Sequence, residues 1–364
     1  AESFAEKVPV LVISGAPGMH ERFRNPMLHH KVNQFDTQRK VFEELTVASA
    51  DLCDPETALR EIDRVLAAIA RYKRPGYLEL PRDMVSTRGT HIAAAVAQEE
   101  HSEPAALAEA VQEAMEKINA AEQPVILVGG EIHRFGLQEQ AMQLAEKTNV
   151  PVTVSILAKS AIPETHPLYM GVYAGALGDE QVRSYVENSD CLILLGVLLT
   201  DINLGVYTAH LDQSRSIHAA SERITIAHHY YEEVTAQDFM LGLVNSELNP
   251  CSHDWVKPEQ PSASFVPAPG AQITVERLFQ QIDAFLDCNT VVIADPGDSL
   301  FGAIDLVTCR AAHFLSPAYY TSLGFAVPAC IAVQLSNPTL RPLVLVGDGA
   351  FQMTGMELST AVRY

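Results

Sequence analysis

The sequence predicts an α/β fold with parallel sheets covered by helices, and two observations carry this prediction. Short apolar runs rich in Val, Ile and Leu recur along the chain, and helical patterns alternate with them. Strands that are apolar on both faces belong in parallel sheets with helices on each side. The predicted strands are "VPVLVIS" (8–14), "GYLELP" (76–81), "PVILVGG" (124–130), "VPVTVS" (150–155), "DCLILLG" (190–196), "TVVIAD" (290–295) and "PLVLVGD" (342–348).

The segments between these runs have the spacing of amphipathic helices. In residues 104–121 ("PAALAEAVQEAMEKINAA") and in residues 135–148, apolar residues recur every three or four positions. This spacing places the apolar side chains on one face of a helix. We therefore expect these helices to cover the sheets.

The chain is long enough for two or three domains, and two seams divide it. Residues 86–103 lose strand character before a helix that begins at Pro104. Residues 247–272 contain five of the 21 prolines and show no periodicity, which is typical of an interdomain linker. The predicted domains are 1–88, 103–247 and 271–364, with a linker at 248–270.

The composition excludes several classes of partner. The chain has 25 Lys and Arg against 45 Asp and Glu, a net charge of −20, which argues against a nucleic acid or an anionic membrane surface. No apolar run reaches the roughly 18 residues of a membrane helix, so we expect a soluble, cytoplasmic protein. The cysteines are far apart without a C-x-x-C pair, and we expect all of them to be reduced. They are Cys53, Cys191, Cys251, Cys288, Cys309 and Cys330.

The two ends of the sequence lie in patterns of regular structure. The start, "AESFAEKVPVLVISG", lacks the basic region and cleavage site of a signal peptide and runs almost directly into a strand. The end, "ELSTAVRY", stops inside an amphipathic helical pattern. We therefore expect the chain to be a fragment of a longer protein.

An acidic residue between two glycines, Gly347-Asp348-Gly349, follows the last predicted strand and precedes a helix. In open α/β sheets, ligands bind at the carboxyl ends of strands, where helix N-termini offer free amides. The glycines would let the backbone approach a ligand, and the carboxylate suits Mg²⁺ bound to a diphosphate. A tight turn with Asp348 as helix N-cap explains the same residues, and the motif alone leaves both interpretations open.

Three other stretches resolve this choice through a resemblance. They are "NPMLHHKVNQFDTQ" (25–38), "DPGDSLFGAIDL" (295–306) and "YYTSLGFAVPA" (319–329). Together with "GDGAFQMTGMELSTA", they resemble thiamine-diphosphate-dependent 2-oxo acid decarboxylases, in particular the indolepyruvate and phenylpyruvate decarboxylases. The adjacent histidines are typical of the pyruvate decarboxylase branch of that family.

The resemblance implies a three-domain architecture. Residues 1–88 would be the C-terminal half of a pyrimidine-binding domain, and residues 103–247 a central domain of regulatory or structural role. Residues 271–364 would be the N-terminal half of a diphosphate-binding domain. The family's active site forms between two subunits, so the resemblance implies at least a homodimer, with a homotetramer also common.

The resemblance also implies the roles of single residues. Asp348 would bind Mg²⁺, and the amides of Gly349 and Ala350 would hold the diphosphate. Leu323 would lie under the cofactor and impose its bent shape. The full implied cofactor-binding set is Pro296, Gly297, Asp298, Ser299, Thr321, Ser322, Leu323, Gly347, Asp348, Gly349 and Ala350.

Catalytic and substrate-binding residues follow from the same resemblance. His29 and His30 would exchange protons, since an ordinary histidine has a pKa of about 6.5. Phe301 and Met353 would line the substrate cavity, although both side chains suit a hydrophobic core equally well. "DTQRKVFEELTVASADL" resembles the aryl-pyruvate enzymes, so phenylpyruvate or indolepyruvate is favoured over pyruvate as substrate. We assign no role to the second pair, His228 and His229.

Further catalytic acids and Mg²⁺ ligands of the family have no counterpart between Ala1 and Tyr364, so we expect this chain alone to release no CO₂. One alternative function is an acetolactate-synthase-like carboligase, which binds FAD. The histidine pair argues against it, and "VGGEIHRFG" has glycines at the wrong spacing for a dinucleotide. The other alternative is a non-catalytic assembly subunit, which would not need Asp348, Leu323 or the histidines.

Overall fold

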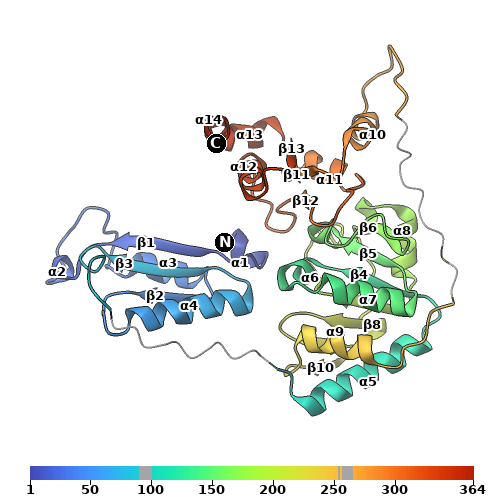
Figure 1. The fold of residues 1–364 in the computed structure, drawn as a ribbon, viewed down its shortest axis with the longest axis horizontal. Helices are drawn as coiled ribbons and strands as arrows, with labels where there is room; N and C mark the ends of the chain where they lie inside the picture. The colour runs from blue at the N-terminus through green and yellow to red at the C-terminus, as the bar shows by residue number, and fades with distance from the viewer. Residues whose placement is uncertain (90–100, 253–254, 256–264) are drawn as a thin grey trace. The chain divides into compact units, whose positions relative to one another are not determined.

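The computed structural model describes residues 1–89, 101–252, 255 and 265–364 (Figure 1). The chain divides into two compact units, residues 1–100 and 101–364, each of which is described by itself. Each contains parallel strands and helices, so the predicted α/β class is confirmed. The predicted seam at 86–103 and the linker at 248–270 lie partly outside the described residues.

The first unit is built on a three-stranded parallel sheet with the order β1-β3-β2. On one face of the sheet, Val65 and Ile69 of α4 pack against Ala50 and Leu78. On the other face, the Phe42 ring stacks on Tyr77 with 4.3 Å between ring centroids. The elements are α1 (Glu2–Ala5), β1 (Leu11–Ala16), α2 (Met19–Arg22), α3 (Thr37–Glu43), β2 (Ala48–Asp51), α4 (Ala58–Tyr72) and β3 (Gly76–Pro81).

The second unit begins with a seven-stranded sheet with the order β10-β9-β8-β7-β4-β5-β6. The strands β8, β7, β4, β5 and β6 are parallel, while β9 pairs antiparallel with β8 and with β10. The strands are β4 (Pro124–Val128), β5 (Val152–Ser155), β6 (Tyr169–Tyr173), β7 (Cys191–Leu195), β8 (Ser216–Ala219), β9 (Ile224–Ile226) and β10 (His229–Tyr231).

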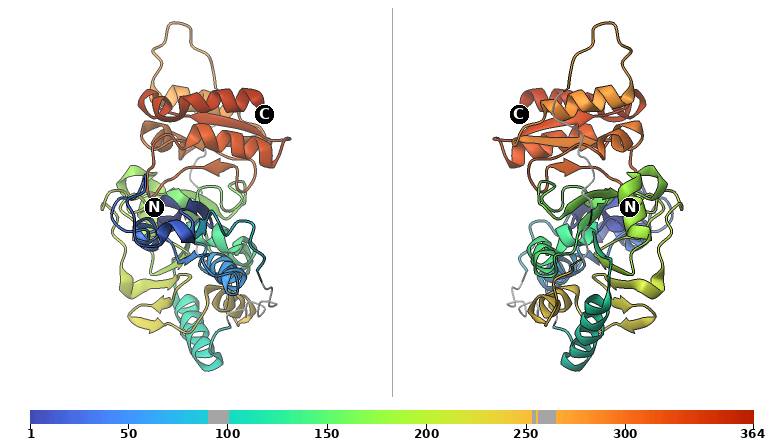
Figure 2. Two further views of the ribbon diagram at one scale, coloured as in Figure 1. Left: turned by 90° about the vertical axis from the view of Figure 1, so that its left-hand side faces the viewer. Right: turned by 90° about the vertical axis from the view of Figure 1, so that its right-hand side faces the viewer.

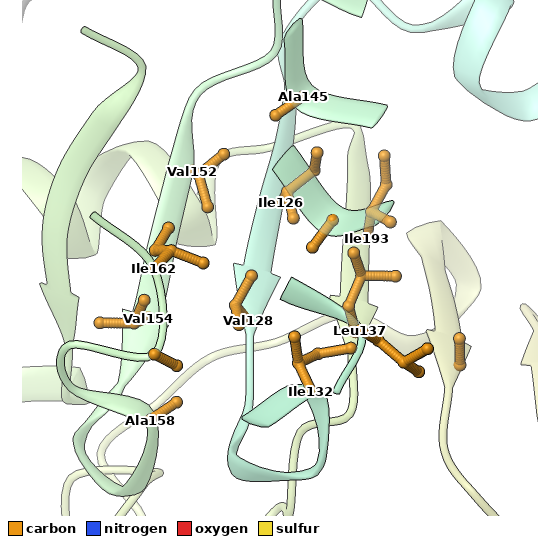
Figure 3. Close-up of a cluster of buried hydrophobic side chains, with 14 of the residues drawn as sticks. Ile126, Val128, Ile132, Leu137, Ala145, Val152, Val154, Ala158, Ile162 and Ile193 are labelled. Carbon is orange, nitrogen blue, oxygen red and sulfur yellow. The ribbon is translucent and has the colours of Figure 1, made fainter. Parts of the chain in front are cut away.

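Helices cover both faces of this sheet, which explains why its central strands are apolar throughout. One face carries the main hydrophobic core, to which α5, α6, α7 and α9 contribute side chains. Figure 3 shows Ile126, Val128 and Ile193 of this core beside Ile132 of α6 and Ala145 of α7. On the opposite face, Val182 and Val186 of α8 belong to a second hydrophobic cluster with residues of β4, β6 and β7. The helices are α5 (Pro104–Ala120), α6 (Gly130–Phe135), α7 (Gln138–Thr148), α8 (Glu180–Glu187) and α9 (Ala236–Asn245).

The second sheet of this unit has three parallel strands in the order β12-β11-β13. Successive residues of β11 point to opposite faces: Val291 and Ile293 pack on α12, while Val292 and Ala294 face α10 and α11. Figure 2 shows helices on both sides of this sheet, drawn in orange and red. The elements are α10 (Val275–Phe285), β11 (Thr290–Ala294), α11 (Asp298–Ala303), β12 (Phe314–Leu315), α12 (Ala326–Ser336), β13 (Arg341–Leu345), α13 (Asp348–Thr354) and α14 (Leu358–Arg363).

The expectation that all cysteines are reduced is wrong for one pair. Cys288 and Cys309 form a disulfide with 4.9 Å between their Cα atoms. Cys288 lies just before β11 and Cys309 lies before β12, so the pairing of these two parallel strands brings both residues to the same end of the sheet. Cys53, Cys191 and Cys330 are free thiols. In the part of the chain that is described, no helix combines the length and apolar character needed to cross a membrane.

Candidate cofactor and active site

The Gly347-Asp348-Gly349 turn lies at the carboxyl end of β13, directly before α13. Gly347 occupies the N-cap position of α13, so the interpretation of Asp348 as N-cap is wrong. A Cβ atom added to Gly347 or to Gly349 would meet no protein atom within 4 Å. Packing therefore does not explain the two glycines, and the space above the turn is open to a ligand.

Asp348 is exposed at this turn. Its Oδ1 atom accepts a hydrogen bond from the Gly349 amide at 2.8 Å, and this bond does not use Oδ2. Carboxylate oxygens are suitable ligands for Mg²⁺, which also binds phosphate oxygens and water. Within the described residues, no group of three or more His, Cys, Asp or Glu side chains is arranged to hold a metal ion. Asp348 is the one carboxylate in the Gly347-Asp348-Gly349 turn.

The stretch 295–299 begins at the end of β11 with Asp295, a residue that the sequence analysis did not single out. Asp295 is fully buried, and its two carboxylate oxygens accept hydrogen bonds from the amides of Gly324 at 3.0 Å and Ala326 at 3.1 Å. Gly297 follows with a φ of 107°, a conformation that favours glycine, and caps α11. Asp295 thus holds the 319–326 stretch against the end of β11.

The stretch 319–325 is a loop with two left-handed residues, Thr321 at φ 60° and Gly324 at φ 83°. Besides its bond to Asp295, this loop is attached to α13, because Thr354 donates a hydrogen bond to the Gly324 carbonyl at 2.8 Å. The predicted cofactor stretches at 295–299, 319–325 and 347–350 therefore meet at the carboxyl ends of β11 and β13. Leu323 projects from this loop with 49% of its surface exposed.

The two predicted substrate residues have different surroundings. Phe301 on α11 is partly buried and packs against the main hydrophobic core. Met353 on α13 is 63% exposed, and its Cβ lies 3.1 Å from the position of a Cβ added to Gly324. Met353 is therefore placed beside the 319–325 loop, whereas Phe301 serves the core in this structure.

His29 and His30 belong to the first unit, on the segment that connects α2 to α3. Both side chains are exposed, and their rings lie edge to face with 5.4 Å between centroids. His30 has a left-handed backbone with a φ of 64°. A polar network that the sequence analysis missed joins the two ends of this segment to the sheet. It joins Ser14, Arg22, Gln38, Asp51, Tyr77 and Glu79.

In the seven-stranded sheet, "VGGEIHRFG" has a structural explanation. A Cβ atom on Gly129 would lie 2.1 Å from the carbonyl oxygen of Gly196, so close packing of two loops requires this glycine. Glu131 at the start of α6 is buried and accepts hydrogen bonds from the amide of Ser221 at 2.7 Å and from its hydroxyl at 3.0 Å. A buried carboxylate at a helix N-terminus repels phosphate, which argues against a dinucleotide at this point.

Comparisons with known proteins agree with this geometry. A family model described as "Thiamine pyrophosphate enzyme, central domain" matches residues 111–240. A second, described as "Thiamine pyrophosphate enzyme, C-terminal TPP binding domain", matches residues 297–364. The second match contains the turn at Asp348, the loop at 319–325 and α11.

Among curated proteins, an indole-3-pyruvate decarboxylase from Azospirillum brasilense is 36% identical over all of this chain and 66% of its own length. An α-keto-acid decarboxylase from Mycobacterium tuberculosis is 30% identical over all of this chain and 65% of its own length. A probable pyruvate decarboxylase from Schizosaccharomyces pombe is 28% identical over 99% of this chain and 64% of its own length. The chain thus spans just under two thirds of the length of these relatives.

Proposed function

Because this chain belongs to the thiamine pyrophosphate enzyme family, we propose that the full-length protein decarboxylates a 2-oxo acid without oxidation, using thiamine diphosphate and Mg²⁺. The products would be CO₂ and an aldehyde. The observation that carries this proposal is the open turn at Gly347-Asp348-Gly349, whose glycines have no packing role. Its place inside the matched thiamine-pyrophosphate-binding domain supports the diphosphate as the proposed ligand.

In this proposal the second unit binds the cofactor. Asp348 would bind Mg²⁺, and the amide of Ala350 would donate a hydrogen bond to the diphosphate, joined by the Gly349 amide once it exchanges its bond to Asp348 for the ligand. Leu323 would pack beneath the cofactor rings, which would cover the half of its apolar surface that is now exposed. The remaining assigned contacts are those of Pro296, Gly297, Asp298, Ser299, Thr321, Ser322 and Gly347.

Thiamine diphosphate, when bound, supplies a carbon nucleophile and takes up the electron pair that CO₂ leaves behind. The chain's own residues would orient the substrate and move protons. The imidazole nitrogens of His29 and His30 would donate and accept the protons that aldehyde formation and release require, since histidine changes charge near neutral pH. The exposed position of both rings would allow this exchange.

An aryl 2-oxo acid, phenylpyruvate or indolepyruvate, is the proposed substrate. It is supported by the identity of 36% to a relative named indole-3-pyruvate decarboxylase, against 28% to one named probable pyruvate decarboxylase. Met353 is a more suitable pocket residue than Phe301, because its side chain is exposed beside the cofactor loop while Phe301 packs in the core.

The domain and assembly assignments are part of the same proposal. We assign 1–88 to a pyrimidine-binding domain, 103–247 to a central domain and 271–364 to a diphosphate-binding domain. A homodimer or homotetramer is expected, because the family builds its site between subunits. The expected location is the cytoplasm. An acetolactate-synthase-like carboligase is the second candidate, and the buried Glu131 argues against the flavin that it would carry.

The test is CO₂ release by the full-length protein from pyruvate, a branched 2-oxo acid, phenylpyruvate and indolepyruvate in parallel. The proposal predicts the highest kcat/KM for one of the two aryl substrates and no flavin absorbance. Met353→Ala should change the ranking of the four substrates, whereas Met356→Ala, on an 84% exposed residue of the following turn, should not. Absence of CO₂ from every substrate would refute the proposed activity, and a preference for pyruvate would refute the proposed substrate.

A further inference from the structure

The segment that carries His29 and His30 contains little regular structure of its own. Between the end of β1 and the start of α3 it forms the four-residue helix α2, followed by turns. Two residues near its middle, Arg24 and Asn25, have left-handed backbones, as does His30. A segment of this kind keeps one conformation only if its surroundings hold it. The contacts at its two ends are therefore decisive.

The first contact is made by Arg22, the last residue of α2. Its guanidinium donates to Asp51 at 2.7 Å and to Glu79 at 3.3 Å, while its Nε donates to the Pro17 carbonyl at 3.0 Å. Asp51 and Glu79 are register partners on the parallel strands β2 and β3, so their carboxylates lie side by side. Only 15% of the Arg22 side chain and 3% of the Glu79 side chain are exposed.

Arginine is chemically suited to this position. Two adjacent carboxylates repel each other unless a cation lies between them, and burial of Glu79 increases the cost of leaving it unpaired. The planar guanidinium can donate to two acceptors in fixed directions, which the single ammonium group of lysine cannot reproduce. The Arg22 contacts therefore fix the end of α2, from which the histidine segment departs.

The second contact comes from the other side of the histidines. Gln38 of α3 donates to the Tyr77 hydroxyl at 2.9 Å, and that hydroxyl donates to the second carboxylate oxygen of Glu79 at 3.1 Å. Gln38 also donates to the hydroxyl of Ser14 at 2.6 Å. The segment before the histidines and the segment after them are thus both attached to one buried carboxylate.

A third set of contacts closes the segment on itself. The ammonium group of Lys31, directly after the pair, donates to the carbonyl of Pro26 at 3.0 Å and of Asn25 at 3.2 Å. It also donates to the Asn25 side chain. This closure makes residues 25–31 a compact loop. The attachments of Arg22 and Gln38 then determine where the loop lies relative to the sheet.

We propose that Arg22 and Glu79 are positioning residues that hold the His29–His30 loop from both sides, with Tyr77 linking Glu79 to Gln38. The effect on turnover rests on the proposed decarboxylase function, because it assumes that the histidines move protons. The attachment itself does not rest on that function. Loss of either side would let the histidines move by an ångström or more, and a displacement of about 1 Å can cost about 100-fold in rate.

The test uses four variants of the full-length protein: Arg22→Met, Arg22→Lys, Tyr77→Phe and, as a control, Arg60→Met on the exposed side of α4. Hydrogen exchange of the amides of residues 23–36 reports the attachment without any assay of activity. We expect faster exchange in Arg22→Met and Tyr77→Phe and an unchanged rate in Arg60→Met. Arg22→Lys preserves the charge of the side chain, and Tyr77→Phe preserves the volume of the ring. If Arg22→Met does not fold, these two variants decide the question.

Activity separates positioning from general stabilisation. For Arg22→Met we expect kcat to fall about 10- to 100-fold, with the Kd for thiamine diphosphate and the KM within a factor of about two. Arg22→Lys should recover part of kcat, and Tyr77→Phe should lose less than Arg22→Met. Unchanged exchange in residues 23–36, or an unchanged kcat in Arg22→Met of an active enzyme, would overturn the proposal. If the wild-type protein releases no CO₂, the proposed function fails while the exchange result still decides the attachment.

Discussion

Asp295 attaches the 319–325 loop to the end of β11, and its replacement gives the sharpest structural prediction. The carboxylate has no exposed surface and accepts two backbone hydrogen bonds, from Gly324 and Ala326, whose amides are buried with it. Asp295→Ala removes both acceptors at once. The two buried amides would lose their acceptor and could not form hydrogen bonds to water instead. The folded state would therefore lose more stability than two ordinary hydrogen bonds contribute.

The size of the loss in stability follows from the number of buried amides that are left without an acceptor. A buried donor left without a partner costs about 1–3 kcal/mol, so Asp295→Ala should lower the free energy of unfolding by about 2–6 kcal/mol. Asp295→Asn keeps the shape and one acceptor oxygen and should lose about half as much. Because the loop carries Leu323 and Thr321, both variants should also bind thiamine diphosphate more weakly.

The assay is urea unfolding of the full-length protein followed by circular dichroism, combined with calorimetric titration of thiamine diphosphate. Asp212→Ala is a matched control, because Asp212 also accepts a backbone hydrogen bond, from Ser214, but on the exposed surface. Its loss of stability should be clearly smaller. A change below about 1 kcal/mol in Asp295→Ala would refute the reasoning, because one stranded buried donor alone costs that much.

Two further predictions concern buried charges. Lys159 and Glu164 form an ion pair with 2.9 Å between Nζ and Oε1, and each side chain is 1% exposed. Lys159→Met should therefore lower the free energy of unfolding by about 3–5 kcal/mol, because it leaves the buried Glu164 carboxylate without its cation. The double variant Lys159→Met with Glu164→Gln should lower it by less. A larger loss in the double variant would contradict this. Burial raises the pKa of the Glu79 carboxyl above its ordinary value, so the stability that this shift contributes should be present at low pH and be lost as pH rises through the raised pKa. Glu79→Gln should reduce the change in the free energy of unfolding with pH over this range. An unchanged dependence on pH in this variant would contradict the prediction.

The strands and the turn at Gly347-Asp348-Gly349 were predictable because their signals are local. The apolar runs that became β4, β7 and β11 are contiguous, and Gly347-Asp348-Gly349 contains both the freedom and the charge that a ligand site needs. The helix after this turn was also predicted, although its cap is Gly347 and not Asp348. Because neighbouring residues carry these signals, the sequence alone is sufficient to predict these elements.

The supporting contacts were not predictable because they join distant parts of the chain. Asp295 is 29 residues from Gly324, and Arg22 is 57 residues from Glu79. Each pair is brought together by parallel strands and their crossovers, and neither has a local pattern. The Cys288–Cys309 pairing was missed for the same reason, since only the alignment of β11 with β12 brings the two cysteines together. The one local signal for the role of Asp295 was its position directly after the apolar strand in "TVVIAD".

The central claim is that the turn at Asp348 holds the diphosphate of the cofactor through Mg²⁺. It is tested most directly by calorimetric titration of thiamine diphosphate, with and without Mg²⁺, into the full-length wild-type protein, Asp348→Asn and the control Asp287→Asn, an exposed turn residue before β11. The account predicts Mg²⁺-dependent binding in the wild type and the control. For Asp348→Asn it predicts affinity weakened by more than about 100-fold, because loss of a residue that merely supports a metal ligand already costs about 10- to 100-fold. An unchanged Kd in Asp348→Asn would contradict it.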